Sequence, residues 1–298
     1  MAFITKDIDE LLKPANLEIN IFEKMNPELS MLGMFEKKNN QSRKEFAFAK
    51  NTTNAEKLIL DGIMKEPVEI REAADFPEVQ IIGINKNIGK MRKLGFQAKF
   101  TQEAISDDIN YDKIQLTTEM MGYSIARYLN RHAYQILIQS AGSSTADVQL
   151  GDGAWDEGNE SIDDDFKHIK RAFESQEGFE YTLTDAFVSQ EAEWAAEDYY
   201  DAVRDGGYDP NNVRKSRLRG IQELESGLLG LDMNVKPAKW YYNIDGRHNL
   251  FHDKYGTFIH INRYDQVDLE PAYTIIQMYV IYGFGVINND AVCFVEGV

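Results

Sequence analysis

The stretch from Ser106 to Gly142 constrains the fold more than any other part of the chain, because it predicts one uninterrupted helix. Ser106 is a favourable N-cap, the two aspartates after it suit the positive end of a helix dipole, and Gly142 is a typical helix end. No proline interrupts the segment, and at about 1.5 Å per residue the predicted helix is roughly 50 Å long. Globular helices average about 11–12 residues, so we expect this one to be a spine on which other elements pack.

One face of the predicted helix is apolar. Its apolar and aromatic side chains recur every three or four residues. They are Met121, Ile125, Tyr128, Leu129, His132, Ile136 and Ile138. These positions do not keep a strict heptad, which argues against a coiled coil. Gly122 costs about 1 kcal/mol relative to alanine unless close packing requires a glycine there.

The residues before this helix predict an extended β-hairpin, which we place at residues 67–101. Its second strand is marked by alternating apolar and polar side chains from Phe96 to Phe100. Basic side chains mark its tip or edge in an otherwise acidic protein; they are Lys86, Lys90, Arg92 and Lys93. Charges on an exposed edge discourage unwanted strand pairing, and they equally suit an acidic patch on a neighbouring copy.

The rest of the chain alternates short helices and strands, so the predicted fold class is α+β. Helices are predicted at 161–178 and 191–204, the second with Trp194 and either Tyr199 or Val203 facing inward. Apolar runs between turn residues predict the strands. These lie at 181–188, 228–235, 240–244, 257–261, 275–282 and 291–295.

Composition limits the classes of function. The 298 residues, 43% of them apolar, suffice for one large domain or two closely packed ones. A net charge of −17 argues against direct binding of nucleic acid or an anionic membrane, since phosphate contacts need clustered Lys and Arg. No signal peptide begins the sequence, and the longest apolar run is too short for a membrane span. We therefore predict a soluble protein made in the cytoplasm, with its single cysteine, Cys293, in the core rather than acting as a nucleophile.

The best metal candidate is a histidine cluster, His248 and His252 with Asp253 and His260 nearby. The glutamate of an HExxH metalloprotease motif is absent and glycines flank the pair, so turn or loop histidines are the simpler explanation. His132 is expected to be a core or interface histidine. The sequence has no phosphate-binding loop, dinucleotide fingerprint or nucleophile elbow. We therefore predict no enzymatic activity, no cofactor and no metal.

Four segments carry a resemblance to a known family. Phe100–Asp108 resembles a passage from a hairpin strand into a spine helix, and Ala186–Trp194 resembles a strand-to-helix step. Leu228–Val235 resembles a glycine followed by an apolar strand, and Tyr282–Val292 resembles a closing Tyr-Gly pattern before a final strand. In this order they resemble the major capsid protein of tailed double-stranded DNA viruses, whose Hong Kong 97-type fold encapsulin shells share.

The resemblance implies a division of the chain into an N-terminal arm, an E-loop hairpin that overlaps a neighbouring subunit, a peripheral domain with the spine helix, and an axial domain. The corresponding residues are 1–50 for the arm, 67–101 for the E-loop, 51–66, 102–165 and 256–272 for the peripheral domain with its helix at 106–141, and 166–255 and 273–298 for the axial domain. It also implies that Arg263, Asp265 and Asp268 lie near a local three-fold axis, where residues from different subunits would pair.

The implied function is that of a structural shell protein. It would assemble through pentamers and hexamers into an icosahedral shell around viral double-stranded DNA, in a virion formed after synthesis in the host cytoplasm. The expected partners are other copies of the chain and portal, scaffolding and cement proteins. Two alternatives stay open: an encapsulin-type nanocompartment shell, and a metal-dependent hydrolase that uses His248, His252 and His260.

Overall fold

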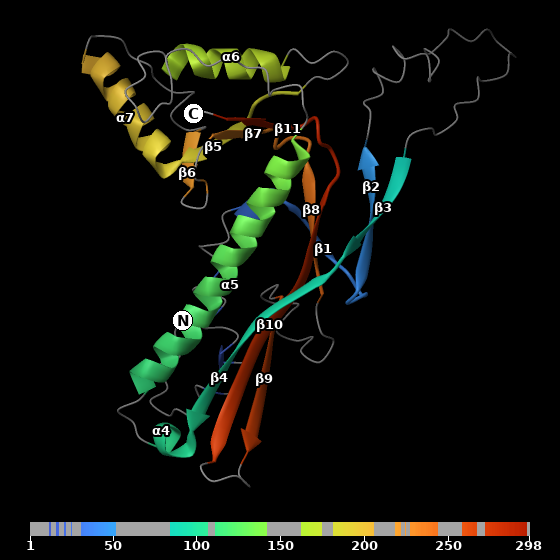
Figure 1. Ribbon diagram of the computed structural model, residues 1–298, viewed down its shortest axis with the longest axis vertical. Helices are drawn as coiled ribbons and strands as arrows, with labels where there is room; N and C mark the ends of the chain where they lie inside the picture. Colours follow the sequence, from blue (N-terminus) through green and yellow to red (C-terminus); the bar gives the residue numbers. More distant parts are fainter. Residues whose placement is uncertain are drawn as a thin grey trace, which may run out of the picture. The chain divides into compact units, whose positions relative to one another are not determined.

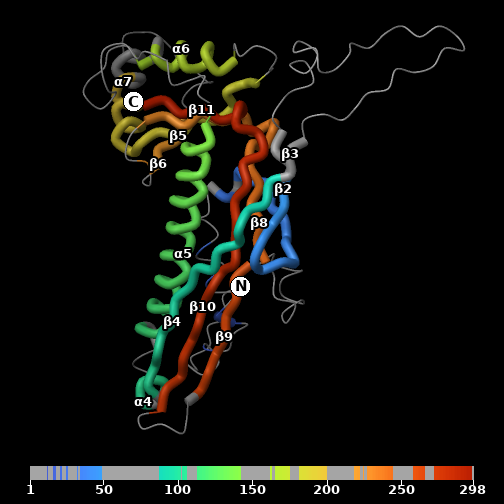
Figure 2. Tube along the Cα trace, turned by 45° about the vertical axis from the view of Figure 1, so that its right-hand side comes forward, coloured from blue at the N-terminus to red at the C-terminus, as the bar shows by residue number. Residues whose placement is uncertain are grey.

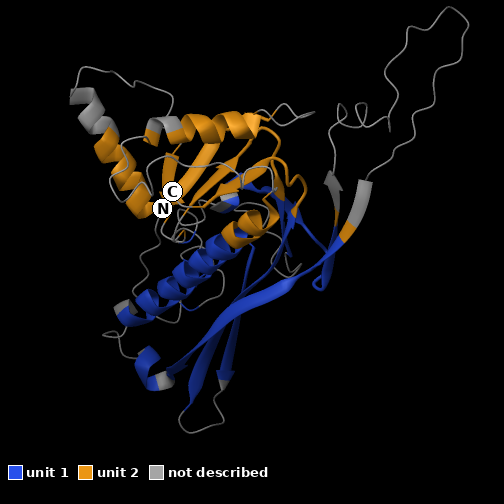
Figure 3. Ribbon diagram, turned by 45° about the horizontal axis from the view of Figure 1, so that its top comes forward, with its two compact units in different colours: residues 1–47, 88–133, 239–285 blue, residues 48–87, 134–238, 286–298 orange. Residues whose placement is uncertain are grey.

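The computed structural model describes most of the chain and divides it into two compact units (Figure 3). One unit comprises Met1–Ala47, Ile88–Ala133 and Lys239–Gly285, and the other Phe48–Asn87, Tyr134–Ala238 and Val286–Val298. The described residues are 12, 16–17, 21, 25, 31–51, 84–106, 111–141, 162–174, 181–205, 218–221, 224, 227–243, 258–266 and 272–296. Within these residues, no helix is both long enough and apolar enough to span a bilayer.

The first unit is built on a sheet that has five strands among the described residues. The strand order is β1 (Glu36–Asn39), β8 (Ala238–Tyr242), β10 (Tyr273–Val286) and β4 (Arg92–Thr101), with β9 (Ile259–Gln266) also paired to β10 (Figure 1). A short 3-10 helix, η2 (Met31–Met34), precedes β1. The central strand β10 is antiparallel to both β4 and β9. It is largely buried, which explains why its sequence is an almost continuous apolar run.

The predicted spine helix is α5 (Tyr111–Ser140), which runs alongside β4 and β10 in both views (Figure 1, Figure 2). Its 30 residues correspond to about 45 Å. The prediction that Ser106 caps this helix is wrong, because Ser106 ends a separate short helix, α4 (Gln102–Ser106). The Thr101 hydroxyl accepts a hydrogen bond from the Ala104 amide at 3.2 Å and caps α4. Helical structure therefore begins at Gln102, before the predicted start at Ser106.

The buried face of α5 turns gradually around the helix. Ile125, Leu129, Ala133 and Leu137 are at most 1% exposed, and each spacing of four residues advances the buried stripe by about 40°. Tyr128 therefore lies outside this stripe and is 48% exposed, so its predicted burial is wrong.

Gly122 of α5 lies close to Ile21, a residue near the N-terminus. A Cβ atom at Gly122 would lie 2.6 Å from Cγ2 of Ile21, which is itself 1% exposed. Close packing therefore requires a glycine at this position, as the sequence analysis allowed.

The β-hairpin differs from the prediction in its partner strand. β3 (Ile84–Lys90) pairs with β2 (Glu45–Asn51), while β4, which follows across one residue, pairs with β10. Residues 67–83 of the predicted hairpin lie outside the described residues. The apolar residues of β2 are a strand signal, but they lie in the segment predicted to be the N-terminal arm. Within the β2–β3 pair, a side chain at Gly89 of β3 would collide with the ring of Phe46 in β2.

The second unit contains a four-stranded sheet and two helices among its described residues. The strand order is β11 (Val292–Val295), β7 (Leu228–Leu231), β5 (Asp185–Ser189) and β6 (Leu218–Ile221). The helices are α6 (Ile162–Glu174) and α7 (Gln190–Asp205), and the Ser189 hydroxyl caps α7 by accepting from the Ala192 amide at 3.1 Å. Both helices, and the strands predicted from 181 onward in this unit, are confirmed in position, with ends shifted by a few residues.

The core of the second unit lies between α6, α7 and the sheet. It contains Phe166, Ile169 and Phe173 of α6 together with Val188 and Cys293 from the strands. Cys293 is fully buried in this core, as predicted, and burial raises the pKa of its thiol to about 12.

The prediction that Trp194 faces inward is wrong. Its side chain is 56% exposed, and α7 instead turns Ala192 and Ala196 toward the core. Small side chains at these positions let the helix approach the sheet closely, which leaves no room for an indole ring.

Candidate assembly surfaces

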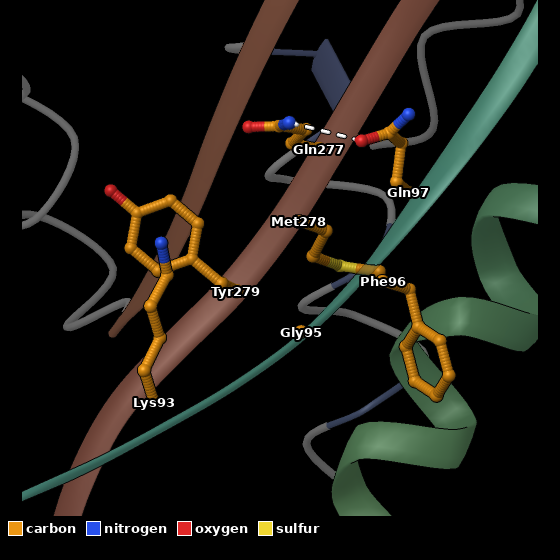
Figure 4. A pocket seen from close by; sticks show the side chains of 7 residues that line it. All are labelled: Lys93, Gly95, Phe96, Gln97, Gln277, Met278 and Tyr279. Atoms are coloured by element: carbon orange, nitrogen blue, oxygen red, sulfur yellow. Dashed lines mark hydrogen bonds between the residues drawn. The ribbon is translucent and has the colours of Figure 1, made fainter.

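One face of the β4–β10 ladder holds a pocket of about 320 Å³ centred on Gly95 (Figure 4). At one end the Lys93 ammonium lies 3.9 Å from the centre of the Tyr279 ring, and at the other Gln277 Nε2 donates to Gln97 Oε1 at 3.1 Å. A Cβ at Gly95 would lie 2.5 Å from the Met278 carbonyl oxygen, so only glycine fits without moving a strand.

Arg92, one of the predicted hairpin residues, is held by α5. Its Nη1 lies 3.1 Å from Nε2 of His132, and Nδ1 of the same ring lies 3.0 Å from the Tyr282 hydroxyl. Since a guanidinium can only donate, Nε2 accepts and the neutral ring carries its proton on Nδ1. Burial, and secondarily the Arg92 charge, lower the pKa of His132. The histidine is thus an interface residue between helix and sheet, as predicted.

The four basic residues predicted for the hairpin edge have different surroundings. Lys90 is exposed at the end of β3, whereas Arg92 and Lys93 contact side chains of the same chain. The side chain of Lys86 in β3 lies outside the described residues. Their role in assembly stays a prediction.

The residues predicted for the three-fold region are at one end of β9 and β10. Arg263 Nε donates to Asp265 Oδ1 at 3.1 Å, and the Thr274 hydroxyl donates to the same oxygen at 2.7 Å. Burial alone would raise the pKa of Asp265, but the hydrogen bonds from Thr274 and Arg263 and the Arg263 charge hold it below its usual value. Arg263 and Asp265 therefore pair within one chain; Asp268 lies outside the described residues.

The proposed metal cluster is only partly described. His248, His252 and Asp253 lie outside the described residues. His260 is 3% exposed, stacks on Tyr279 with ring centres 4.8 Å apart, and lies 2.7 Å through Nε2 from the Asn243 carbonyl oxygen. A carbonyl only accepts, so Nε2 carries a proton and is not free to bind a metal. Elsewhere in the described part of the chain, no three His, Cys, Asp or Glu side chains are grouped to hold a metal ion.

Several large apolar residues are exposed that the sequence patterns do not predict. Leu116 and Met120 of α5 are 59% and 54% exposed, and Ile88 of β3 is 68% exposed. The four-residue spacing of Leu116 and Met120 was a usable signal, because it places both on a second face away from Met121 and Ile125.

Solved structures share this fold over most of their length. The virus-like particle from Pyrococcus furiosus matches with a TM-score of 0.58 at 7% identity, covering 95% of this chain and 98% of its own. The capsid of the cyanophage P-SCSP1u matches at 0.57 and 10% identity, covering 89% and 86%. The holo-SrpI encapsulin complex from Synechococcus elongatus PCC 7942 matches at 0.56 and 10% identity, covering 91% and 87%. Identities this low show the fold alone, which is the Hong Kong 97-type capsid fold.

A family model described as phage capsid protein matches residues 86–296. The chain belongs to the phage capsid protein family. No curated protein sequence matches this capsid protein. The family and the fold confirm the predicted resemblance and the α+β class, and they imply a structural rather than a catalytic role in a virion.

Proposed function

We propose that this capsid protein assembles through pentamers and hexamers into an icosahedral shell that encloses viral double-stranded DNA. The family match over residues 86–296 is the observation that carries the proposal, and the similarity to assembled capsids over about nine-tenths of the chain supports it. Large apolar side chains left exposed on separate elements, among them Ile88, Leu116 and Trp194, are typical of a chain that is completed by neighbours.

In this proposal the chain divides as the resemblance implies, except that β2, expected in the N-terminal arm, forms part of the E-loop base. The β2–β3 pair is the described base of the E-loop, α5 is the spine of the peripheral domain, and the four-stranded sheet with α6 and α7 belongs to the axial domain. Lys86, Lys90, Arg92 and Lys93 would lie in the overlap with a neighbouring subunit. Arg263, Asp265 and Asp268 would meet their counterparts near the three-fold axis.

The charge of the chain is compatible with a DNA container. A net charge of −17 gives the shell acidic surfaces that repel the packaged duplex and let it slide during packaging. Portal, scaffolding and cement proteins would be its partners, and the host cytoplasm its place of synthesis.

Two other functions deserve a test. The similarity to an encapsulin complex favours a nanocompartment shell as the second candidate. A hydrolase using His248, His252 and His260 is less well supported, because the hydrogen bond to Asn243 occupies Nε2 of His260.

The deciding experiment is size-exclusion chromatography of the purified full chain with negative-stain electron microscopy. Uniform shells, or rings of five and six subunits, are expected, and a monomer at every protein and salt concentration would refute a shell of either kind. Particles isolated from the producing cell should contain nuclease-protected DNA; an enclosed enzyme instead would favour the nanocompartment. Stoichiometric zinc in the purified protein would favour the hydrolase.

A further inference from the structure

The outward face of α5 carries large apolar side chains in contact with solvent. Leu116 is 59% exposed and Met120 is 54% exposed, one turn apart. The core-facing side of the same helix is occupied, since Ile125 and Leu129 are fully buried. A soluble monomer rarely places two such residues together on a helix surface without a partner to cover them.

Basic side chains lie along the same face of the helix as Met120. Lys113, Arg127 and Arg131 are exposed, and at about 100° per residue they lie within roughly 20° of Met120 around the helix axis. Lys113 and Arg131 form no ion pair with any described residue, and the Arg127 guanidinium lies 5.8 Å from the centre of the Tyr123 ring. We call Lys113, Leu116, Met120, Arg127 and Arg131 the Met120 face.

No described acidic side chain neutralises the Met120 face from its own helix. Glu119 lies about 100° around the helix from Met120, and it accepts a hydrogen bond from Gln115 at 2.8 Å. The Met120 face is therefore a cationic, partly apolar surface on a chain whose net charge is −17. Its charge favours an acidic partner.

A surface of the opposite character lies on α7. Trp194 is 56% exposed, and the exposed side chains of Glu191, Glu197 and Asp198 lie within about 60° of it around the helix axis. We call these four residues the Trp194 face. Tryptophan is among the residues that most often contribute strongly to protein interfaces, and its exposure within an acidic surface is best explained by a basic, apolar partner.

We propose that the Trp194 face of one copy docks on the Met120 face of another copy of this chain. The indole would cover Leu116 and Met120, and the thioether of Met120 contacts aromatic rings favourably. Glu197 and Asp198 would lie on the side of Arg127 and Arg131, whose positive charge they complement. The inference rests on the proposed shell, because it needs copies of the chain to meet.

The two faces differ in length, and the shorter could lie within the longer. The Met120 face spans 19 residues from Lys113 to Arg131, about 28 Å of helix, whereas the Trp194 face spans the eight residues from Glu191 to Asp198, about 12 Å. A contact between two different faces is heterologous, and heterologous contacts close into rings or continue from copy to copy, as a shell requires. A self-complementary face would stop at a dimer.

Charge reversal tests the docking. The full chain is prepared as Arg127→Glu with Arg131→Glu, as Glu197→Arg with Asp198→Arg, and with all four changes together. Each pair should lower the assembled fraction at least tenfold in analytical ultracentrifugation, because each places like charges across the contact. The fourfold variant restores opposite charges and should recover at least half of wild-type assembly.

Controls separate docking from folding and from the shell itself. Lys38→Glu with Lys44→Glu reverses two exposed lysines outside both faces and should assemble like the wild type, and circular dichroism should show equal folding for all variants. Unchanged assembly of both pairs, or a folded fourfold variant that stays unassembled, would overturn the docking. If the wild type forms dimers but no shells, and both double variants lose these dimers, the shell proposal is overturned and the docking proposal stands. If the wild type stays monomeric, both proposals are overturned.

Discussion

The core of the second unit and the partly exposed side-chain contacts of the β4–β10 ladder in the first unit are held together by different forces. Between α6, α7 and the four-stranded sheet, the core side chains are apolar and almost fully buried, and Phe173 has no exposed surface. On the β4–β10 ladder, Lys93 lies over Tyr279 on one face and Arg92 donates to His132 on the other, all partly open to solvent.

This difference indicates that apolar burial sets the stability of the chain, whereas the polar contacts orient exposed elements. Burial of apolar surface is worth about 25 cal/mol per Å², so fully buried core side chains should contribute more to the free energy of unfolding than the partly exposed contacts of the β4–β10 ladder. Partly exposed polar contacts are worth only about 0–1 kcal/mol each, but they fix the direction in which exposed strands and helices present their side chains. Substitutions in the core of the second unit should therefore lower the free energy of unfolding more than substitutions in the ladder contacts do.

The largest effect is expected for Phe173→Ala in α6. Removing a fully buried ring leaves a cavity, and such changes typically cost about 3–5 kcal/mol. Urea unfolding followed by circular dichroism measures the loss. Phe96→Ala is the matched control, since Phe96 is 44% exposed on β4 and should cost about 1 kcal/mol or less. Equal losses would contradict the contrast between the two regions.

A smaller effect is expected for Gly95→Val on β4. The new Cβ would lie 2.5 Å from the Met278 carbonyl oxygen, so one strand must move, at about 1–3 kcal/mol. Gln97→Val, two residues along the same strand face, is the control, because it replaces a side chain for which space exists and removes only the exposed hydrogen bond from Gln277. The same urea titration decides between them, and a neutral Gly95→Val would show that the ladder adapts freely.

Sequence periodicity predicted most elements, because local apolar spacing encodes them. It predicted α6, α7 and the strands around β5, β7 and β11, where the inward positions are apolar and regularly spaced. It failed for Trp194 and Tyr128, because a large aromatic side chain on an amphipathic helix was assumed to face the core. In α7 the core instead accepts the alanines at 192 and 196, a choice fixed by how closely the helix approaches the sheet.

Contacts between distant parts of the chain were the least predictable. Arg92 and His132 are 40 residues apart and meet only because α5 lies on the sheet that includes β4. The pairing of β2 with β3 likewise depends on a contact across residues 52–83. Nothing in the local pattern of either segment specifies its partner.

A modest pH effect is expected from His132. Its pKa is lowered in the folded chain, so between that value and the ordinary value of about 6.5 the unfolded chain binds more protons. The contribution of the neutral ring is therefore complete above about pH 6.5 and is lost as pH falls through the lowered pKa. Thermal unfolding of wild type and His132→Gln between pH 7.5 and 5 should show a shallower pH slope for the variant. Identical slopes would mean that Arg92 and burial do not disfavour the protonated ring.

The smallest effect is expected for Asp265→Asn at the end of β9. The side chain is 40% exposed, so losing its ion pair with Arg263 should cost about 0–1 kcal/mol, and the amide oxygen can still accept from Thr274. The pKa of Asp265 is lowered in the folded chain, so its contribution is present at neutral pH and is lost as pH falls below about 4. Wild type and variant should therefore converge in melting temperature at acidic pH. If the variant instead folds normally but fails to assemble, the residue acts between subunits, and the intrachain pair with Arg263 is not its main role.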